Sequence, residues 1–151
     1  NELWFGIIGK GSWYENRDGL KKSVSFSNRK DISELILVSS KNHQELRLKN
    51  LLTKMNFGET KKIGSVGCKV VSILKGEADV YISLSGKTSP KDWDMAAPHA
   101  IIEAAGGSFT HADKTNLDYQ KSDYSQSGCL IASHGKSHKN ICQNVIKFLS
   151  E

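Results

Sequence analysis

The chain has 151 residues, of which 38% are hydrophobic and 25% charged, and 21 Lys and Arg against 16 Asp and Glu give a net charge of +5. A chain of this length can bury a core of its own, and no apolar run approaches the roughly 18 residues of a membrane-spanning helix. The basic residues are scattered, with Lys21-Lys22 and Lys61-Lys62 as the pairs, so a nucleic-acid partner is not favoured.

The first thirty residues predict short antiparallel strands. Strands are expected over residues 3–8, 12–14 and 23–26. Asp18-Gly19, between the second and third, is a strong hairpin signal. These strands would carry a large aromatic face with few residues nearby to cover it, from Trp4, Phe5 and Trp13. We therefore expect residues 1–30 to complete the sheet of a preceding domain.

From Leu35 onward, apolar strands alternate with amphipathic helices. Strands are expected over residues 35–38, 78–84, 108–111 and 130–133. Apolar side chains at helical spacing predict helices over residues 44–55, 68–75, 93–105 and 139–149. This alternation predicts an α/β domain over residues 31–151, with a layered mixed β-sheet and flanking helices.

The sequence contains start and stop signals for the expected helix over residues 93–105. Asp92 or Asp94 is expected at its N-cap, and Pro98 in or near its first turn, where a missing N–H costs little. Gly106-Gly107 supplies a C-terminal stop. On residue type alone, the acid at this helix start is a cap.

The cysteines and the N-terminal residues indicate the cellular compartment in which the protein is expected. Three cysteines, Cys68, Cys129 and Cys142, match neither a disulfide framework nor a zinc ribbon. The opening residues lack the basic region and long apolar stretch of a secretory signal. His134 and His138 have i, i+4 spacing, but Gly135 lies between them and no third ligand is nearby, so a metal there is not favoured. We expect reduced thiols and a cytoplasmic location without a membrane segment.

The start of this helix also matches a longer sequence motif. The motif consists of Trp93-Asp94-Met95-Ala96-Ala97 followed by Ala105-Gly106-Gly107. It resembles the W-D-x-A-A … A-G-G motif of the inositol monophosphatase superfamily, which are Li⁺-sensitive, Mg²⁺-dependent phosphatases. Glu2-Leu3-Trp4 and Gly76 to Tyr81 are similar to two further family segments, in the same order. The resemblance implies the C-terminal domain of that α-β-α-β fold, with Asp94 as a metal ligand.

Within the superfamily, the chain is most similar to 3'(2'),5'-bisphosphate nucleotidases of the CysQ type. Ser40-Lys41-Asn42-His43 resembles their S-R-x-H, and Lys69 follows Gly64-Ser65 in the expected helix. This likeness implies substrate contacts from Lys41, His43, Ser65 and Lys69. From the residues alone, the glycines could turn N–H groups toward an anion, or Gly64 to Gly67 could be an ordinary strand-to-helix turn. His43 could equally be a solvent-facing residue at a helix start.

Two departures from the nucleotidase pattern leave the substrate open. Lys41 replaces the family arginine and so loses a bidentate fork. Ile82-Ser83 follows Tyr81 where nucleotidases usually carry an arginine, and residues 64–69 are one residue longer than their G-S-S-x-K. Inositol monophosphate or a sugar phosphate is therefore the alternative to a nucleotide.

The resemblance implies hydrolysis of 3'-phosphoadenosine 5'-phosphate to AMP and phosphate in sulfur assimilation, with two or three Mg²⁺ per complete site and inhibition by Li⁺. The family's other metal motifs, a Glu pair and D-P-(I/L)-D-G-(T/S), are not in these 151 residues. We therefore expect the C-terminal half of the enzyme, inactive without the N-terminal half as its partner. A non-catalytic phosphate-binding domain or a weak polyanion binder are the non-enzymatic alternatives, and a homodimer is left open.

Overall fold

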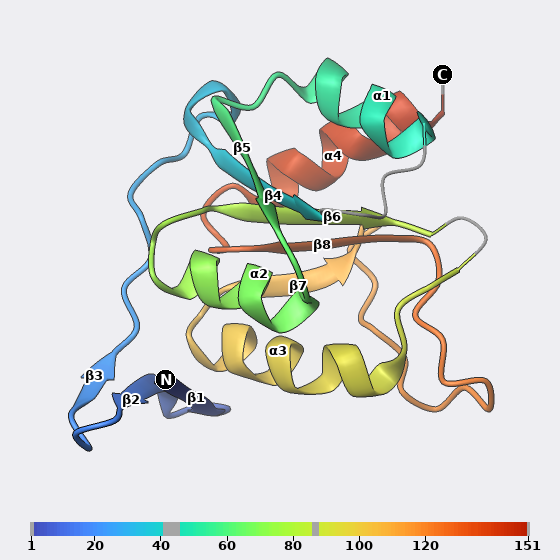
Figure 1. Cartoon of the computed structure of the whole chain (residues 1–151). Coiled ribbons are helices and arrows are strands. Elements are labelled where there is room, and N and C mark those ends of the chain that lie inside the picture. Colours follow the sequence, from blue (N-terminus) through green and yellow to red (C-terminus); the bar gives the residue numbers. More distant parts are fainter. Residues whose placement is uncertain (1, 41–45, 86–87, 151) are drawn as a thin grey trace.

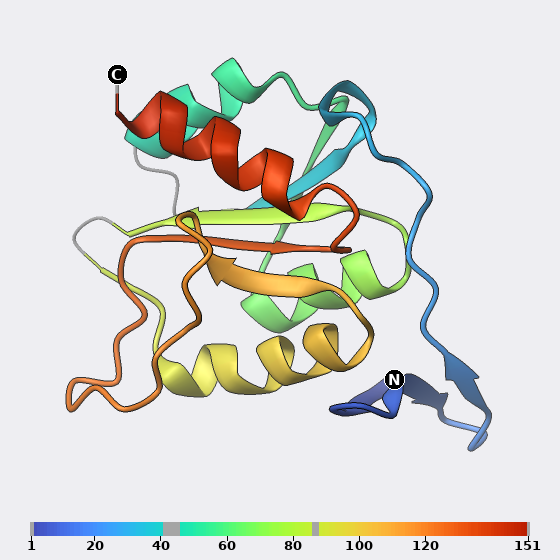
Figure 2. The same ribbon diagram turned by 180° about the vertical axis from the view of Figure 1, so that it is seen from behind.

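Two β-sheets organise the part of the chain that the computed structural model describes, residues 2–40, 46–85 and 88–150 (Figures 1 and 2). The first is a small antiparallel sheet in the order β1-β2-β3, from Glu2–Ile7, Gly11–Asn16 and Lys21–Ser23. The second has five strands in the order β5-β4-β6-β8-β7. No helix within the described ranges is both long and apolar enough to cross a bilayer.

The five-stranded sheet is mixed, as the alternating pattern predicts. Its strands are β4 (Ile36–Ser40), β5 (Glu59–Ile63), β6 (Val80–Leu84), β7 (Ser108–His111) and β8 (Cys129–Ser133). Strand β4 pairs in parallel with β5 and β6, whereas β8 runs antiparallel to both β6 and β7. The α/β fold with a mixed sheet is thereby confirmed.

Helices cover both faces of this sheet (Figures 1 and 2). They are α1 (Leu46–Met55), α2 (Val66–Leu74), α3 (Asp92–Ala104) and α4 (His138–Leu149), and a 3-10 turn, η1, spans Ile32–Glu34. Alternate strand residues point to opposite faces, so Leu37 packs with α1 and α4, whereas Val38 packs with α2 and α3. The two faces therefore have separate apolar cores.

The small sheet rests against α3. The Ser12 hydroxyl donates to the Ile101 carbonyl at 2.6 Å, and Trp4 stacks on Tyr14 with ring centroids 4.8 Å apart. The third strand is shorter and earlier than expected, because the Asn16 side chain accepts the N–H of Leu20 and sets the register there. Phe26, expected in this strand, instead packs on the core beneath α2 and α3.

The start of α3 differs from the sequence expectation. Its N-cap is Lys91, so Asp92 and Asp94 are the first and third helical residues. Asp94 still satisfies an orphan donor, because its Oδ2 accepts the Lys91 N–H at 3.3 Å. Pro98 lies well inside the helix, where its missing N–H cannot bond the Asp94 carbonyl. The helix begins early because residues 90–92 pair with residues 124–126.

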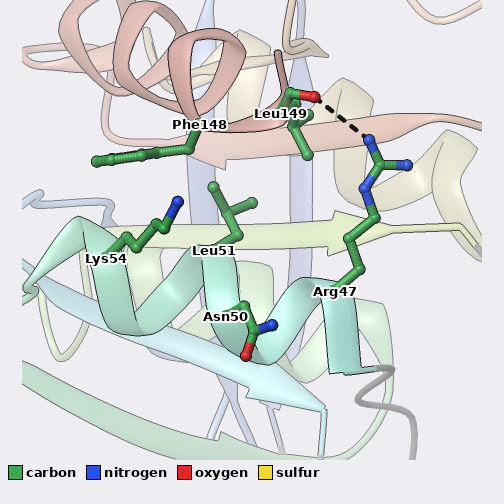
Figure 3. A pocket seen from close by; sticks show the side chains of 6 residues that line it. All are labelled: Arg47, Asn50, Leu51, Lys54, Phe148 and Leu149. Carbon is green, nitrogen blue, oxygen red and sulfur yellow. Dashed lines mark hydrogen bonds between the residues drawn. The ribbon is translucent and has the colours of Figure 1, made fainter. Parts of the chain in front are cut away.

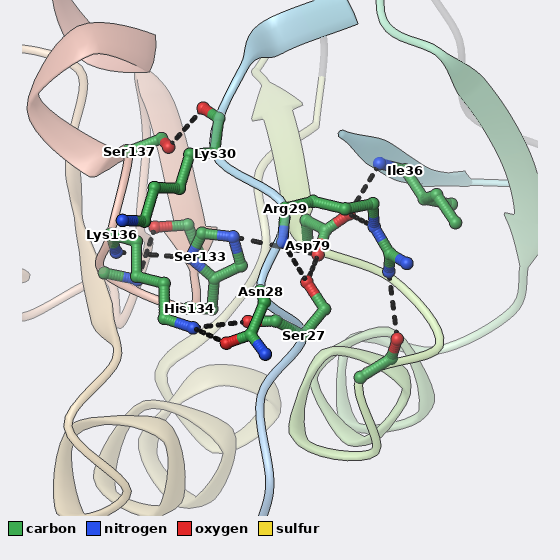
Figure 4. A network of polar contacts seen from close by, with 12 residues as sticks. Ser27, Asn28, Arg29, Lys30, Ile36, Asp79, Ser133, His134, Lys136 and Ser137 are labelled. Atoms are coloured by element: carbon green, nitrogen blue, oxygen red, sulfur yellow. Dashed lines mark hydrogen bonds and ion pairs between the residues drawn. The ribbon is translucent and has the colours of Figure 1, made fainter. Parts of the chain in front are cut away.

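A buried carboxylate ties the small sheet's connector to the larger sheet (Figure 4). Asp79, fully buried just before β6, accepts Arg29 Nε and the Ile36 N–H, each at 2.7 Å. It also accepts the Ser27 hydroxyl. Because Ser27 and Arg29 belong to the connector between β3 and β4, Asp79 fixes that connector at the amino end of β4 and β6. We call Asp79 and these three partners the connector lock.

His134 lies beside the connector lock and makes stability depend on pH. Its Nδ1 accepts the Lys136 N–H at 3.1 Å, and its Nε2 is 3.7 Å from Asp79 Oδ1. Burial lowers the pKa of His134, although the Asp79 charge opposes this. A lowered folded pKa means that, as pH falls through 6.5, the unfolded chain takes up the proton first. The free energy of unfolding therefore falls as the solution is acidified below about pH 6.5.

We predict that His134→Asn flattens this pH dependence, because Asn Oδ1 can keep the Lys136 contact without titrating. Urea unfolding at pH 7.5 and pH 5.5 measures it: the loss of unfolding free energy between these values should be smaller in the variant. Burial also lowers the pKa of His99 and His138, so part of the slope should remain. An unchanged slope would contradict the assignment to His134.

Candidate functional site

The carboxyl ends of three parallel strands, β4, β5 and β6, lie at one edge of the larger sheet. From β4 the chain passes to β5 on one side and then to β6 on the other, with α1 and α2 on opposite faces (Figure 1). Such a reversal opens a crevice outside the strand ends where ligands of α/β proteins bind. The N-termini of α2 and α3 both lie at this edge (Figure 1).

The β5-to-α2 turn brings a hydroxyl and a cation to this edge. Ser65 is the N-cap of α2, and its exposed Oγ accepts the Cys68 N–H at 3.1 Å. Lys69, one turn on, is only 3% exposed, and its Nζ lies 5.1 Å from the centroid of the Tyr81 ring. Burial lowers the pKa of Lys69. Within the described residues, no carboxylate or carbonyl accepts a hydrogen bond from this ammonium.

Asp94 approaches the same place from α3. It is exposed and lies in the first turn, and its charge acts on Tyr81 of β6, the residue whose ring lies under Lys69 Nζ. Burial raises the pKa of Tyr81, and the Asp94 charge raises it further. The site thus combines an exposed carboxylate, a buried ring and a cation without a counter-ion among the described residues. We call Ser65, Lys69, Tyr81 and Asp94 the strand-end cluster.

The strand-end cluster suits an anion that carries a metal ion. Two helix N-termini and the Lys69 charge favour a phosphate group, because their N–H groups and dipoles present positive potential. The Asp94 carboxylate is the hard oxygen ligand that Mg²⁺ prefers. In residues 2–40, 46–85 and 88–150, however, no group of three His, Cys, Asp or Glu could hold a metal ion. A carboxylate oxygen is a suitable ligand for Mg²⁺, and the strand-end cluster supplies one such ligand, Asp94.

The predicted site residues are thus partly placed. Asp94, Ser65 and Lys69 come to one sheet edge from two different helices. Lys41 and His43 lie outside the described residues, although β4, which precedes them, ends at the same edge with Ser40. Their role in binding stays a prediction, as does that of the other three.

Sequence reasoning missed two members of this region. Tyr81 stands in an apolar strand and resembles an ordinary core residue. Gln126 stands in a polar loop, yet it is fully buried and binds the start of α3. The signal for Tyr81 is its place in the Gly76 to Tyr81 segment, whereas no local signal distinguishes Gln126 from the exposed Gln120.

His134 and His138 serve different partners. The Nδ1 of His138 lies 2.8 Å from Ser133 Oγ, and its Nε2 lies 2.9 Å from Thr110 Oγ1. His134 instead faces Lys136 and Asp79. Both rings are used in holding the start of α4 and the end of β8.

A separate pocket lies between α1 and α4 (Figure 3), on the face of the sheet opposite α2 and α3 (Figure 1). It has a volume of about 220 Å³ and is lined by Arg47, Asn50, Leu51, Lys54, Phe148 and Leu149. Arg47 donates to the Leu149 carbonyl at 3.4 Å, and Lys54 lies over the Phe148 ring. None of these six lining residues belongs to the strand-end cluster.

Comparison with known proteins bears directly on this arrangement. The model described as "Inositol monophosphatase family" matches residues 1–148. The 3'(2'),5'-bisphosphate nucleotidase CysQ of Buchnera aphidicola subsp. Acyrthosiphon pisum is 36% identical over 121 residues, which cover 80% of this chain and 43% of that protein. The chain therefore spans less than half the length of this curated relative.

Solved structures share the fold at low sequence identity. The inositol monophosphatase from Anabaena (Nostoc) sp. matches with a TM-score of 0.75 and 22% identity, over 97% of this chain and 55% of that one. An IMPase/NADP phosphatase complexed with Mg²⁺ and phosphate matches with a TM-score of 0.71 and 17% identity, over 95% of this chain and 49% of that one.

Proposed function

The chain belongs to the inositol monophosphatase family, and from this premise we propose that it is part of a divalent-metal-dependent phosphoric monoester hydrolase. The observation that carries the proposal is the strand-end cluster, where exposed Asp94 and buried Lys69 both act on Tyr81 and belong to the first turns of two helices. A phosphate ester there would meet positive potential from the helices and Lys69. Asp94 would hold Mg²⁺, whose chemistry is to activate water and stabilise the leaving oxygen. The remaining ligands would come from polypeptide outside residues 1–151.

For the substrate, we propose 3'-phosphoadenosine 5'-phosphate, hydrolysed to AMP and phosphate. The CysQ nucleotidase of Buchnera supports this choice through its 36% identity. A bisphosphorylated nucleotide carries two anionic groups, and the cluster offers a cation at Lys69 and backbone donors at Ser65. Lys41 and His43, which follow β4, are proposed to contact the nucleotide.

Inositol monophosphate is the second candidate, favoured by two features. The turn from Gly64 to Lys69 is one residue longer than in the nucleotidase pattern, and Ser83 stands close to where that pattern has an arginine. A smaller substrate with a single phosphate needs neither a second cation nor a base-binding surface.

Phosphate release by the full-length protein tests the proposal and separates these substrates. With Mg²⁺, we expect kcat/KM for 3'-phosphoadenosine 5'-phosphate to exceed that for inositol 1-phosphate, and chelation of the metal or addition of Li⁺ to stop turnover. The opposite preference would select the second candidate. Absence of metal-dependent release from both would refute the proposed function.

Lys69→Met separates binding from stability. Methionine keeps most of the length and apolar stem of lysine but loses the charge, so we expect KM for 3'-phosphoadenosine 5'-phosphate to rise about tenfold, the worth of one charge-assisted hydrogen bond. The free energy of unfolding should not fall, because a buried cation is removed that no described residue neutralises. Steady-state kinetics and urea unfolding measure the two effects. The exposed lysine variant Lys49→Met is the control, and an equal rise for inositol 1-phosphate would argue against a nucleotide pocket.

The proposal extends to the setting of the reaction. All three cysteines are unbridged, and burial raises the pKa of Cys129 to about 12, which keeps that thiol protonated. Free thiols suit the cytoplasm. Together with the proposed substrate, they support a cytoplasmic role in sulfur assimilation.

A further inference from the structure

The first turn of α3, which carries Asp94, has one side-chain cap of its own, the long hydrogen bond from the Lys91 N–H to Asp94 Oδ2 at 3.3 Å. The side chain of the N-cap residue Lys91 makes no capping hydrogen bond to the helix. Pro98 has no N–H to bond the Asp94 carbonyl, so one backbone hydrogen bond of the helix is missing at Asp94, the proposed metal ligand. A helix start of this kind needs support from outside the helix.

That support comes from the long loop between β7 and β8. The Tyr124 carbonyl accepts the Asp92 N–H at 2.9 Å, and the Gln126 N–H donates to the Pro90 carbonyl at 2.9 Å. Lys91 also extends its Nζ to the Asp123 carbonyl at 3.0 Å. The loop thus binds the residues immediately before Asp94 without touching its exposed carboxylate.

Gln126 is the centre of this contact. It is fully buried, and its Nε2 donates to Asp92 Oδ1 at 2.7 Å and to the Asp118 carbonyl at 2.6 Å. Both partners can only accept, so the nitrogen must face them. Its own Oε1 is buried and has no partner in the described part of the chain. The side chain is therefore placed for its two N–H groups alone.

We propose that Gln126 is a positioning residue: through Asp92 it fixes the first turn of α3, and with it the carboxylate of Asp94. This inference rests on the proposed function, which makes Asp94 a metal ligand. Residues that hold metal ligands in place commonly change metal affinity by about 10- to 100-fold when they are replaced. Gln126 makes no contact with Asp94 itself, so its effect must pass through the backbone of residues 92–94.

Gln126→Glu tests the proposal with almost no change of shape. Glutamate presents two acceptors to Asp92 and Asp118, so the contact becomes repulsive. In the 151-residue chain, hydrogen exchange of the Asp92 and Asp94 amides should accelerate about tenfold or more, as local opening becomes easier. Gln120→Glu, the same substitution at an exposed position of the same loop, should leave both rates unchanged.

A second substitution should rescue the first. In the double variant, which combines Asp92→Asn with Gln126→Glu, the donor and the acceptor are exchanged. The amide introduced at position 92 can donate to the carboxylate introduced at position 126. Part of the protection should return, although the Asp118 carbonyl still lacks its donor. Unchanged exchange in the single variant, or no recovery in the double variant, would overturn the contact as the support of α3.

The role toward the metal is measured in the full-length protein. Gln126→Glu should raise the Mg²⁺ concentration for half-maximal turnover about tenfold, while kcat at saturating Mg²⁺ changes little, and the double variant should restore part of the affinity. Faster exchange with unchanged Mg²⁺ dependence would reduce Gln126 to a structural residue. Absence of turnover in the unaltered protein would refute the proposed function and the positioning role with it, whereas hydrogen exchange would still report on the loop contact.

Discussion

Asp94→Asn in the full-length protein should lower kcat/KM at least about 100-fold. Without the Asp94 charge the metal ion is held less well, and a bound metal ion contributes several kcal/mol to stabilising the transition state. The fold should survive. Asp94 is exposed, and an Asn Oδ1 can still accept the Lys91 N–H that Asp94 accepts at 3.3 Å. The lost charge at the helix N-terminus is worth about 0.3–1 kcal/mol, so the melting temperature should fall by no more than about 3 °C.

The control for Asp94→Asn is Asp31→Asn. Asp31 is also an exposed carboxylate at a helix start, it makes no side-chain capping bond, and it lies near the opposite edge of the sheet. Phosphate-release kinetics and thermal melting of both variants give the comparison. Near-normal turnover of Asp94→Asn would contradict a metal role for Asp94, whereas parallel losses of activity and melting temperature would assign it to the helix cap.

Asp79→Ala should lower the free energy of unfolding by about 3–5 kcal/mol, the loss expected when one partner of a buried charge pair is removed. Asp79 is fully buried and accepts from three groups of the connector lock, including the Ile36 N–H at the start of β4. Its removal leaves these donors without an acceptor. The free energy of unfolding of a whole domain is about 5–15 kcal/mol, so this single substitution removes a large share of the stability.

Arg29→Ala measures the other half of the pair. The Arg29 side chain is 31% exposed, so water can replace some of what it loses, and we expect a smaller drop than for Asp79→Ala. Urea unfolding of the two single variants and the double variant gives the coupling between them. Additive losses, or a larger effect of Arg29→Ala, would show that Asp79 does not organise the connector.

The sequence predicts the α/β alternation well because local patterns determine it. Leu37 and Val38 lie on opposite faces of β4, and the helix stop at Gly106 falls where α3 ends, since these features depend on neighbouring residues alone. The start of α3 and the third strand of the small sheet were misplaced. Lys91 becomes the N-cap because residues more than thirty positions away pair with it, which no local pattern contains.

The candidate site follows the same division. Asp94, Ser65 and Lys69 were identified through a resemblance, and the fold brings them to one sheet edge. Tyr81 and Gln126 were not, because a tyrosine in an apolar strand and a glutamine in a polar loop acquire their roles only when distant segments meet. The partition into residues 1–30 and 31–151 remains a prediction.

The connector lock sits at the amino ends of β4 and β6, whereas the strand-end cluster sits at their carboxyl ends. The charges that keep the chain folded are thus a full strand length away from those proposed to meet a ligand. Substitutions in the turns after β4, β5 and β6 can therefore change which ligand binds without lowering the stability that the connector lock provides. Such independence gives one architecture room to diversify toward several phosphorylated metabolites.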